Sequence, residues 1–158
     1  MKFINKNLSS FKLTGGIIWL LEMTNDVKKL DTKLANLRTL KKGTVGREVA
    51  AILDDNNYRL IPKFENHDLK HIVLEYEMTM QDEIKMQAYL MGNGNYTLPC
   101  LLFFSLGIFY PTTWRSLSKE FNLGRKTKSI HSLTLEDCKN ECLVKIRNEF
   151  GRKIKSFN

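Results

Sequence analysis

Two of the three histidines in the sequence, His67 and His71, stand four residues apart, with Asp68 between them. On a helix, two residues at this spacing share one face and lie about 6 Å apart along its axis. Both imidazoles can then bind one divalent ion, and zinc metalloproteases use the same spacing. Asp68 lies three residues before His71 and can reach the same side. Two nitrogen ligands and an oxygen ligand suit zinc and tolerate iron or manganese.

A further ligand, or a water molecule in its place, must complete such a site, and Glu83 and Glu75 are the candidates. Glu83 follows His71 by twelve residues, which in one straight helix would separate them by about 18 Å. Glu83 therefore reaches the ion only if the chain turns back within 74–81, where Thr79 is the only ordinary break signal. Glu75 stands on the same helix face as His71 and competes with Glu83. We keep both and place Glu83 first.

The HxxxH pattern has an alternative interpretation, because short motifs often match by chance. The two histidines would then lie on the surface or cap the N-terminal end of a helix. A metal site also leaves two roles open. Three protein ligands leave a position for catalysis, whereas four ligands without water make the metal structural.

The elements that must position these residues are predicted to be helical, since no alternating strand pattern of convincing length occurs. We expect one compact all-α domain over residues 1–158, with about seven or eight helices. Its last predicted helix places Cys138 and Cys142 on one apolar face, where we expect core packing. The individually predicted helices cover about residues 10–23, 27–40, 45–53, a segment that begins at 65 or 66, 98–110 and 135–155.

The string HDLKH at residues 67–71, followed by eleven residues and then Glu83, resembles the signature of the coenzyme Q (ubiquinone) biosynthesis protein 4 family. That signature is HDxxH, eleven residues, then Glu. Residues 37–46 resemble the family's LRxLPxxTxG segment, Gly124-Arg125 resembles its GR element, and 146–151 resembles its LRxELG element.

The resemblance covers about residues 37–151 and implies an all-helical fold. It implies a divalent metal, usually zinc, with His67, Asp68, His71 and Glu83 as the metal-binding and catalytic residues. The implied enzyme is a lyase of ubiquinone biosynthesis, which replaces the ring C1 carboxyl of a polyprenylated hydroxybenzoate by hydroxyl in an oxidative decarboxylation. The family is also associated with organising the complex of quinone-biosynthesis proteins.

The alternative function is a non-catalytic, membrane-peripheral protein or scaffold that binds a prenyl lipid or a quinone and contains a structural metal. The apolar run 98–110 fits either function, as a buried core helix or as one wall of a groove for an isoprenoid tail. Its thirteen residues are too few for a membrane span, which needs about 20. We expect a cytoplasmic protein, monomeric or homodimeric, on the inner face of the cytoplasmic membrane.

The net charge of +8 is unevenly distributed, with +6 over residues 1–42, −4 over 43–110 and +6 over 111–158. An acidic middle between basic ends differs from the continuous basic stripe of nucleic-acid-binding proteins, so we expect no nucleic-acid partner. The basic ends fit anionic lipid headgroups or an acidic partner, and they equally fit solvated helix faces. Three cysteines are too few for a disulfide scaffold.

Overall fold

The computed structural model describes residues 27–62, 64–97, 100–101, 105 and 111–151. These residues form seven α-helices, a single 3-10 turn and no β-strand, which confirms the expected all-α class. The helices are α2 (Val27–Arg38), α3 (Val45–Asp55), α4 (Glu65–Leu74), α5 (Met80–Gly92), α7 (Trp114–Gly124), α8 (Leu135–Cys138) and α9 (Leu143–Phe150), and the 3-10 turn is η2 (Pro111–Thr113).

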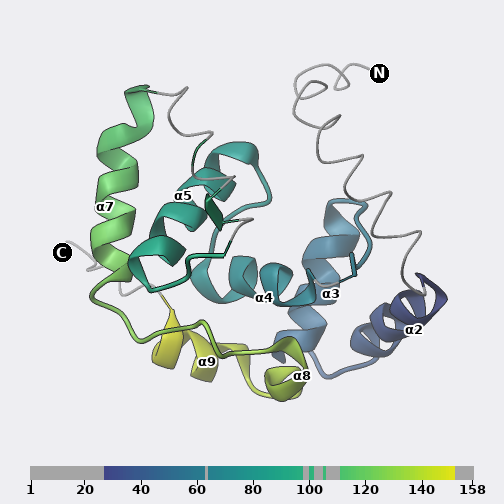
Figure 1. Cartoon of the computed structure of the whole chain (residues 1–158). Coiled ribbons are helices and arrows are strands. Elements are labelled where there is room, and N and C mark those ends of the chain that lie inside the picture. Colours follow the sequence, from purple (N-terminus) through teal and green to yellow (C-terminus); the bar gives the residue numbers. More distant parts are fainter. Residues whose placement is uncertain (1–26, 63, 98–99, 102–104, 106–110, 152–158) are drawn as a thin grey trace.

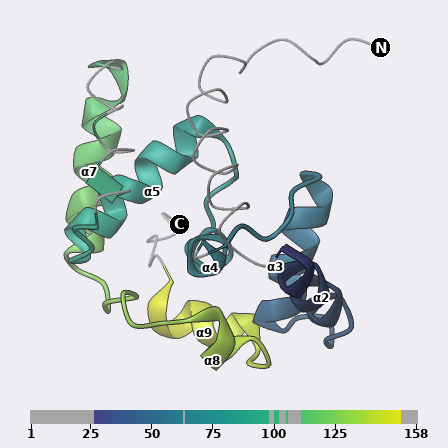
Figure 2. The same ribbon diagram turned by 45° about the vertical axis from the view of Figure 1, so that its right-hand side comes forward.

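Helix α4 runs through the middle of the molecule, between α3 and α5, with α8 and α9 below it in the view of Figure 1. The turned view in Figure 2 shows the same neighbours, with α2 packed on α3 and α7 packed on α5. The predicted helix at 10–23 lies outside the described residues, and the one at 98–110 lies mostly outside them.

The main hydrophobic core surrounds α4, which contributes Leu69 and Val73, both fully buried. Helix α2 adds Leu34 and Leu37, and α3 adds Val49. The same core includes side chains of α5, α8 and α9. Helix α4 is thus fixed by neighbours on several sides, and a rigid element is what a precise ligand geometry needs.

The chain turns back between α4 and α5, as the Glu83 hypothesis requires. Helix α4 ends at Leu74, and its C-cap residue Glu75 has a φ of 57°, in the left-handed region that few non-glycine residues adopt. Helix α5 begins after Thr79, whose hydroxyl accepts a hydrogen bond from the main-chain N–H of Asp82 at 3.2 Å. A threonine N-cap of this kind stabilises a helix start by about 1 kcal/mol.

The prediction of one helix over 135–155 is wrong. The described part of this segment forms two short helices, α8 and α9, joined by a turn that is hydrogen-bonded to the start of α3. The main-chain N–H of Val45 donates to the carbonyl of Glu141 at 2.9 Å, and Thr44 and Cys142 form an isolated antiparallel bridge. These main-chain bonds between distant segments replace the helical ones, a tertiary effect that apolar spacing does not reveal.

The two cysteines of this segment therefore have different environments. Cys138 lies in α8, is 2% exposed and belongs to the core, as expected. Cys142 caps the start of α9 with an extended backbone and is exposed, so its predicted core role is wrong.

Helix α7 has no counterpart among the individually predicted helices. Of its residues, only Leu117 and Gly124 are buried. Instead, α7 approaches α5 through glycines. A Cβ at Gly92 would lie 2.0 Å from the carbonyl oxygen of Phe121, and one at Gly124 would lie 2.1 Å from that of Tyr89.

Candidate metal centre

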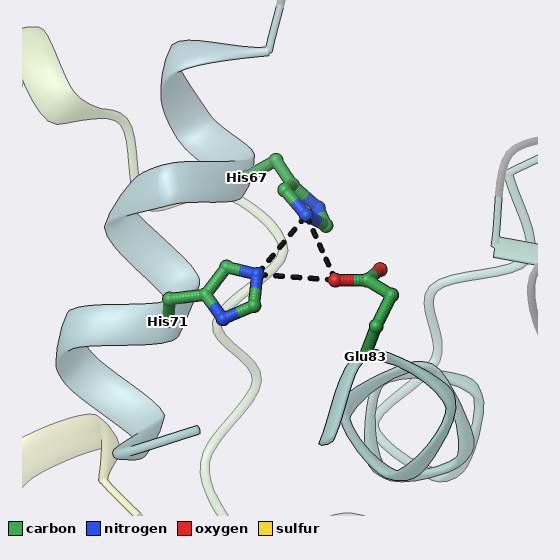
Figure 3. Close-up of side chains that lie close together, drawn as sticks. All are labelled: His67, His71 and Glu83. Atoms are coloured by element: carbon green, nitrogen blue, oxygen red, sulfur yellow. Dashed lines mark hydrogen bonds and ion pairs between the residues drawn. The ribbon is translucent and has the colours of Figure 1, made fainter. Parts of the chain in front are cut away.

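His67 and His71 project from one face of α4 toward Glu83, which lies in the first turn of α5 (Figure 3). The two imidazoles lie one helical turn apart and meet edge to face, with their ring centroids 4.9 Å apart. The turn between α4 and α5 brings Glu83 opposite them. Among the described residues, this trio forms the one group of three histidine, cysteine or acidic side chains with ligand atoms close enough to share an ion.

The three ligand atoms form a nearly equilateral triangle. Nε2 of His67 lies 3.2 Å from Nε2 of His71, and Oε2 of Glu83 lies 3.2 Å from the first and 3.1 Å from the second. Ligands about 2.0–2.1 Å from an ion are roughly 3.3 Å apart in a tetrahedral site and roughly 3.0 Å apart in an octahedral one. The observed distances lie between these values, so the residues present fit a divalent ion of either geometry.

A main-chain contact fixes the orientation of the buried histidine. Nδ1 of His71 lies 3.1 Å from the carbonyl oxygen of Tyr76 and donates to it, because a carbonyl can only accept. In the neutral ring, Nε2 then carries the lone pair that faces Glu83 and His67. This is the arrangement that metal-binding histidines usually have, with the second nitrogen bonded to a carbonyl or carboxylate. His71 is 3% exposed, so its ring orientation is also fixed by packing.

The second oxygen of Glu83 has a partner of its own. The side-chain amide of Gln87, one turn further along α5, donates from Nε2 to Oε1 of Glu83 at 2.6 Å. Oε2 remains for the two histidines. Neither Gln87 nor the carbonyl of Tyr76 was predicted from the sequence to belong to the site. The i,i+4 spacing of Glu83 and Gln87 is a signal for the first, whereas no side-chain pattern predicts the second.

Burial and neighbouring charges shift the pKa values of Glu83 and His67 in opposite directions. Burial alone would raise the pKa of Glu83, but its contacts with His67 and His71 outweigh burial and hold that pKa well below the usual range. Burial disfavours the charged form of His67, yet the hydrogen bond and charge of Glu83 raise its pKa overall. Both shifts favour an ion pair between a protonated His67 and an ionised Glu83.

Asp68 lies beside the trio without joining it. It is 9% exposed on α4, and its carboxylate is not among the three mutually close ligand atoms. Burial raises the pKa of this carboxyl to about 6, although the neighbouring His67 and His71 act against the shift. A ligand role for Asp68 thus stays a prediction.

Glu75, the competing candidate, is directed elsewhere. Its carboxylate forms an ion pair with Arg147 of α9 at 3.2 Å, and its side chain is 53% exposed. The left-handed conformation at Glu75 ends α4 and removes it from the helix face that carries His71. Of the two acidic candidates, the structure brings Glu83 to the histidines.

Two neutral imidazoles and one carboxylate bind zinc in catalytic sites with an open position, and they bind iron in sites of the facial-triad type. An ion held there would act as a Lewis acid and could hold an anionic oxygen of a substrate. None of the helices in the described parts of the chain is long and apolar enough to cross a bilayer.

Comparison with known proteins finds a relation in structure alone. No protein-family model and no curated protein sequence matches the chain. A crystal structure of a protein from Nostoc punctiforme, provisionally described as a ubiquinone biosynthesis protein, matches with a TM-score of 0.57 and 19% sequence identity. The match covers 77% of this chain and 68% of the other. At this identity it establishes that the chain has a fold similar to that of the Nostoc protein.

Proposed function

We propose that this chain is a metal-dependent enzyme of ubiquinone biosynthesis that acts on the ring carboxylate of a polyprenylated hydroxybenzoate. The observation that carries the proposal is the triangle of His67, His71 and Glu83, with its 3.1–3.2 Å edges. The HDxxH–x11–E resemblance and the fold shared with the Nostoc protein support the pathway. Zinc is the first candidate for the metal.

The charge of the centre suits a carboxylate substrate. A divalent ion bound by two neutral imidazoles and the Glu83 carboxylate leaves a net charge of +1. One substrate carboxylate at an open coordination position would neutralise it. Because His71 is 3% and Glu83 12% exposed, this attraction would act in a poorly solvated site, where it is stronger than in water.

The proposed reaction replaces the C1 carboxyl of the ring by hydroxyl and releases carbon dioxide. With molecular oxygen as the oxidant, one oxygen atom enters the ring hydroxyl and the other is reduced to water with two electrons and two protons from an external donor. The metal supplies Lewis-acid binding of the carboxylate. Asp68 is the proposed proton carrier, because its buried carboxyl follows His67 directly on α4.

The proposed place for the isoprenoid tail is the apolar segment 98–110. Large apolar side chains are exposed just before, within and just after it, at Tyr96 (65%), Leu101 (42%) and Trp114 (54%). These side chains are the proposed points of contact with a lipid or a membrane surface. We propose peripheral attachment to the inner face of the cytoplasmic membrane and contact with other quinone-biosynthesis proteins.

The test combines elemental analysis with an assay on a carboxyl-labelled substrate. Wild-type protein, purified without a histidine tag, should contain about one metal ion per chain. It should release labelled carbon dioxide from a prenylated hydroxybenzoate. His71→Ala should lose both, whereas His131→Ala, which changes an exposed histidine outside the trio, should retain both. A wild type that binds no metal would overturn the proposal.

A non-catalytic lipid carrier or scaffold with a structural metal is the second candidate. The burial of His71 and Glu83 favours it, because a structural ion needs no access from solvent. It predicts bound metal and co-purified prenyl lipid without release of carbon dioxide. Turnover that depends on His71 would exclude it.

A further inference from the structure

Gln87 is a buried polar residue that directly contacts one of the three site residues. Its side chain donates from Nε2 to Oε1 of Glu83 at 2.6 Å, and the residue is 3% exposed. The direction of the bond is certain, since an ionised carboxylate only accepts and two oxygens at this distance would repel each other. Hydrogen bonds to a charged group are about twice as strong as neutral ones.

The two oxygens of Glu83 consequently have separate partners. Oε2 faces Nε2 of His67 and Nε2 of His71, whereas Oε1 faces the amide of Gln87. A carboxylate with both oxygens free can bind an ion through one or through both of them. Binding through both would occupy the position that a substrate oxygen needs.

We propose that Gln87 is a positioning residue that restricts Glu83 to one metal-binding oxygen and so keeps a coordination position open for a substrate carboxylate. This inference rests on the proposed metal-dependent function and specifies how the same site stays open. Gln87 acts through Glu83 and does not itself approach the ion.

The surroundings of Gln87 make it a suitable anchor. Its neighbours in sequence, Met86 and Ala88, are fully buried, so the helix cannot rotate locally. The thiol of Cys100 donates to the main-chain oxygen of Gln87 at 3.6 Å, which adds a contact from the following segment. A neutral amide also binds Oε1 without neutralising Glu83, which keeps its charge for the metal.

The test uses cobalt(II) as the metal and 4-hydroxybenzoate as the probe carboxylate. The visible bands of protein-bound cobalt(II) lose intensity when its coordination number rises, so they report a change of Glu83 from one to two bound oxygens. Gln87→Met keeps the length of the side chain and removes the donor. Gln87→Asn keeps the polarity but is too short to reach Oε1. Gln81→Met changes an exposed glutamine on the same helix and is the matched control.

We expect Gln87→Met and Gln87→Asn to weaken the cobalt bands and to bind 4-hydroxybenzoate roughly tenfold more weakly, a usual effect of losing a partner of a metal ligand. Gln81→Met should behave as wild type. A structural role alone would lower the unfolding midpoint without changing the spectrum. Unchanged spectra and probe affinity in both donor-free variants would overturn the role of Gln87 and leave the metal-dependent function standing. A wild type that binds no cobalt would overturn both.

Discussion

The guanidinium of Arg147 donates two hydrogen bonds to the main-chain oxygen of Ile72, from Nε at 3.0 Å and from Nη2 at 2.9 Å. Ile72 directly follows His71 in the last turn of α4, where carbonyl groups lack helical partners. The same guanidinium forms an ion pair with Glu75, the residue that ends the helix. Helix α9 is thus tied to the end of the helix that carries both histidines.

Replacement of Arg147 by methionine should therefore destabilise the protein by about 1–3 kcal/mol, because the carbonyl of Ile72 loses charged donors at a site that is two-thirds buried. Urea unfolding measures this loss. Lys145→Met on the same helix is the matched control, since its ion pair with Glu141 is well exposed and contributes little. Equal unfolding free energies for the two variants would show that Arg147 does not hold α4.

The two histidines should differ in their effect on stability while sharing their effect on metal binding. His71→Ala removes a buried ring and the donor to the carbonyl of Tyr76, so we expect a loss of about 1–3 kcal/mol in the metal-free protein. His67 has a side chain that is 25% exposed, so His67→Ala should cost less. Titration with zinc should show loss of tight binding in both variants and retention in His131→Ala. Tight zinc binding by His67→Ala would remove this residue from the ligand set.

A lower pH should stabilise the metal-free fold and weaken its affinity for the metal. The raised pKa of His67 means that its contribution is complete below its unfolded value of 6.5 and is lost as pH rises through the folded value. The contribution of Asp68 has the same sign, because its pKa is raised from 3.8 to about 6. It is complete below pH 3.8 and is lost as the pH rises through about 6. Glu83 has a lowered pKa, so its contribution is present above 4.5 and is lost only in strong acid.

The metal-free protein should consequently be more stable near pH 5 than near pH 8 as far as these groups are concerned, while zinc affinity should rise over the same range. Metal binding requires a neutral His67, so each ion displaces a proton. Urea unfolding and zinc titration at several pH values measure the two trends. Glu83→Gln removes the charge that raises the pKa of His67 and should flatten the first. A zinc affinity independent of pH would contradict the proton displacement.

The parts of the fold that local sequence determines were predictable, and those that depend on distant main-chain contacts were not. The buried positions of α2 and α3 follow their apolar spacing, and Thr79 marked the start of α5 as a helix cap does. The break between α8 and α9 arises because Glu141 pairs with Val45, nearly a hundred residues earlier. The spacing of apolar residues within the segment gives no indication of that pairing.

The candidate site was predictable to the extent that it depends on spacing along one helix. The four-residue interval placed His67 and His71 together, and the absence of a straight path to Glu83 required a turn, which the structure contains. The position of Asp68 outside the triangle depends on side-chain direction, which spacing does not specify. The carbonyl of Tyr76 reaches His71 after a left-handed residue at Glu75, which is not a usual residue for that conformation.

The contact between α5 and α7 predicts that Gly92→Ala destabilises the protein, which is the opposite of the usual effect of alanine in a helix. An alanine at a helical glycine normally stabilises a protein by about 0.5–1 kcal/mol. At Gly92 the new Cβ would lie 2.0 Å from the main-chain oxygen of Phe121, which cannot move unless the helices separate. Gly92→Ala should instead destabilise the protein by about 3 kcal/mol in urea unfolding, as overpacking does.

Gly94→Ala separates this steric effect from backbone strain. Gly94 has open space around it but a φ of +94°, so alanine there should cost only about 1 kcal/mol. Lys119→Ala on the exposed side of α7 should change little, since exposed substitutions usually remain within about 0.5 kcal/mol. The order Gly92, Gly94, Lys119 in decreasing cost is expected only if α5 and α7 touch through their glycines. A stabilising effect of Gly92→Ala would mean that the two helices lie further apart, and that α7 does not support the helix that carries Glu83.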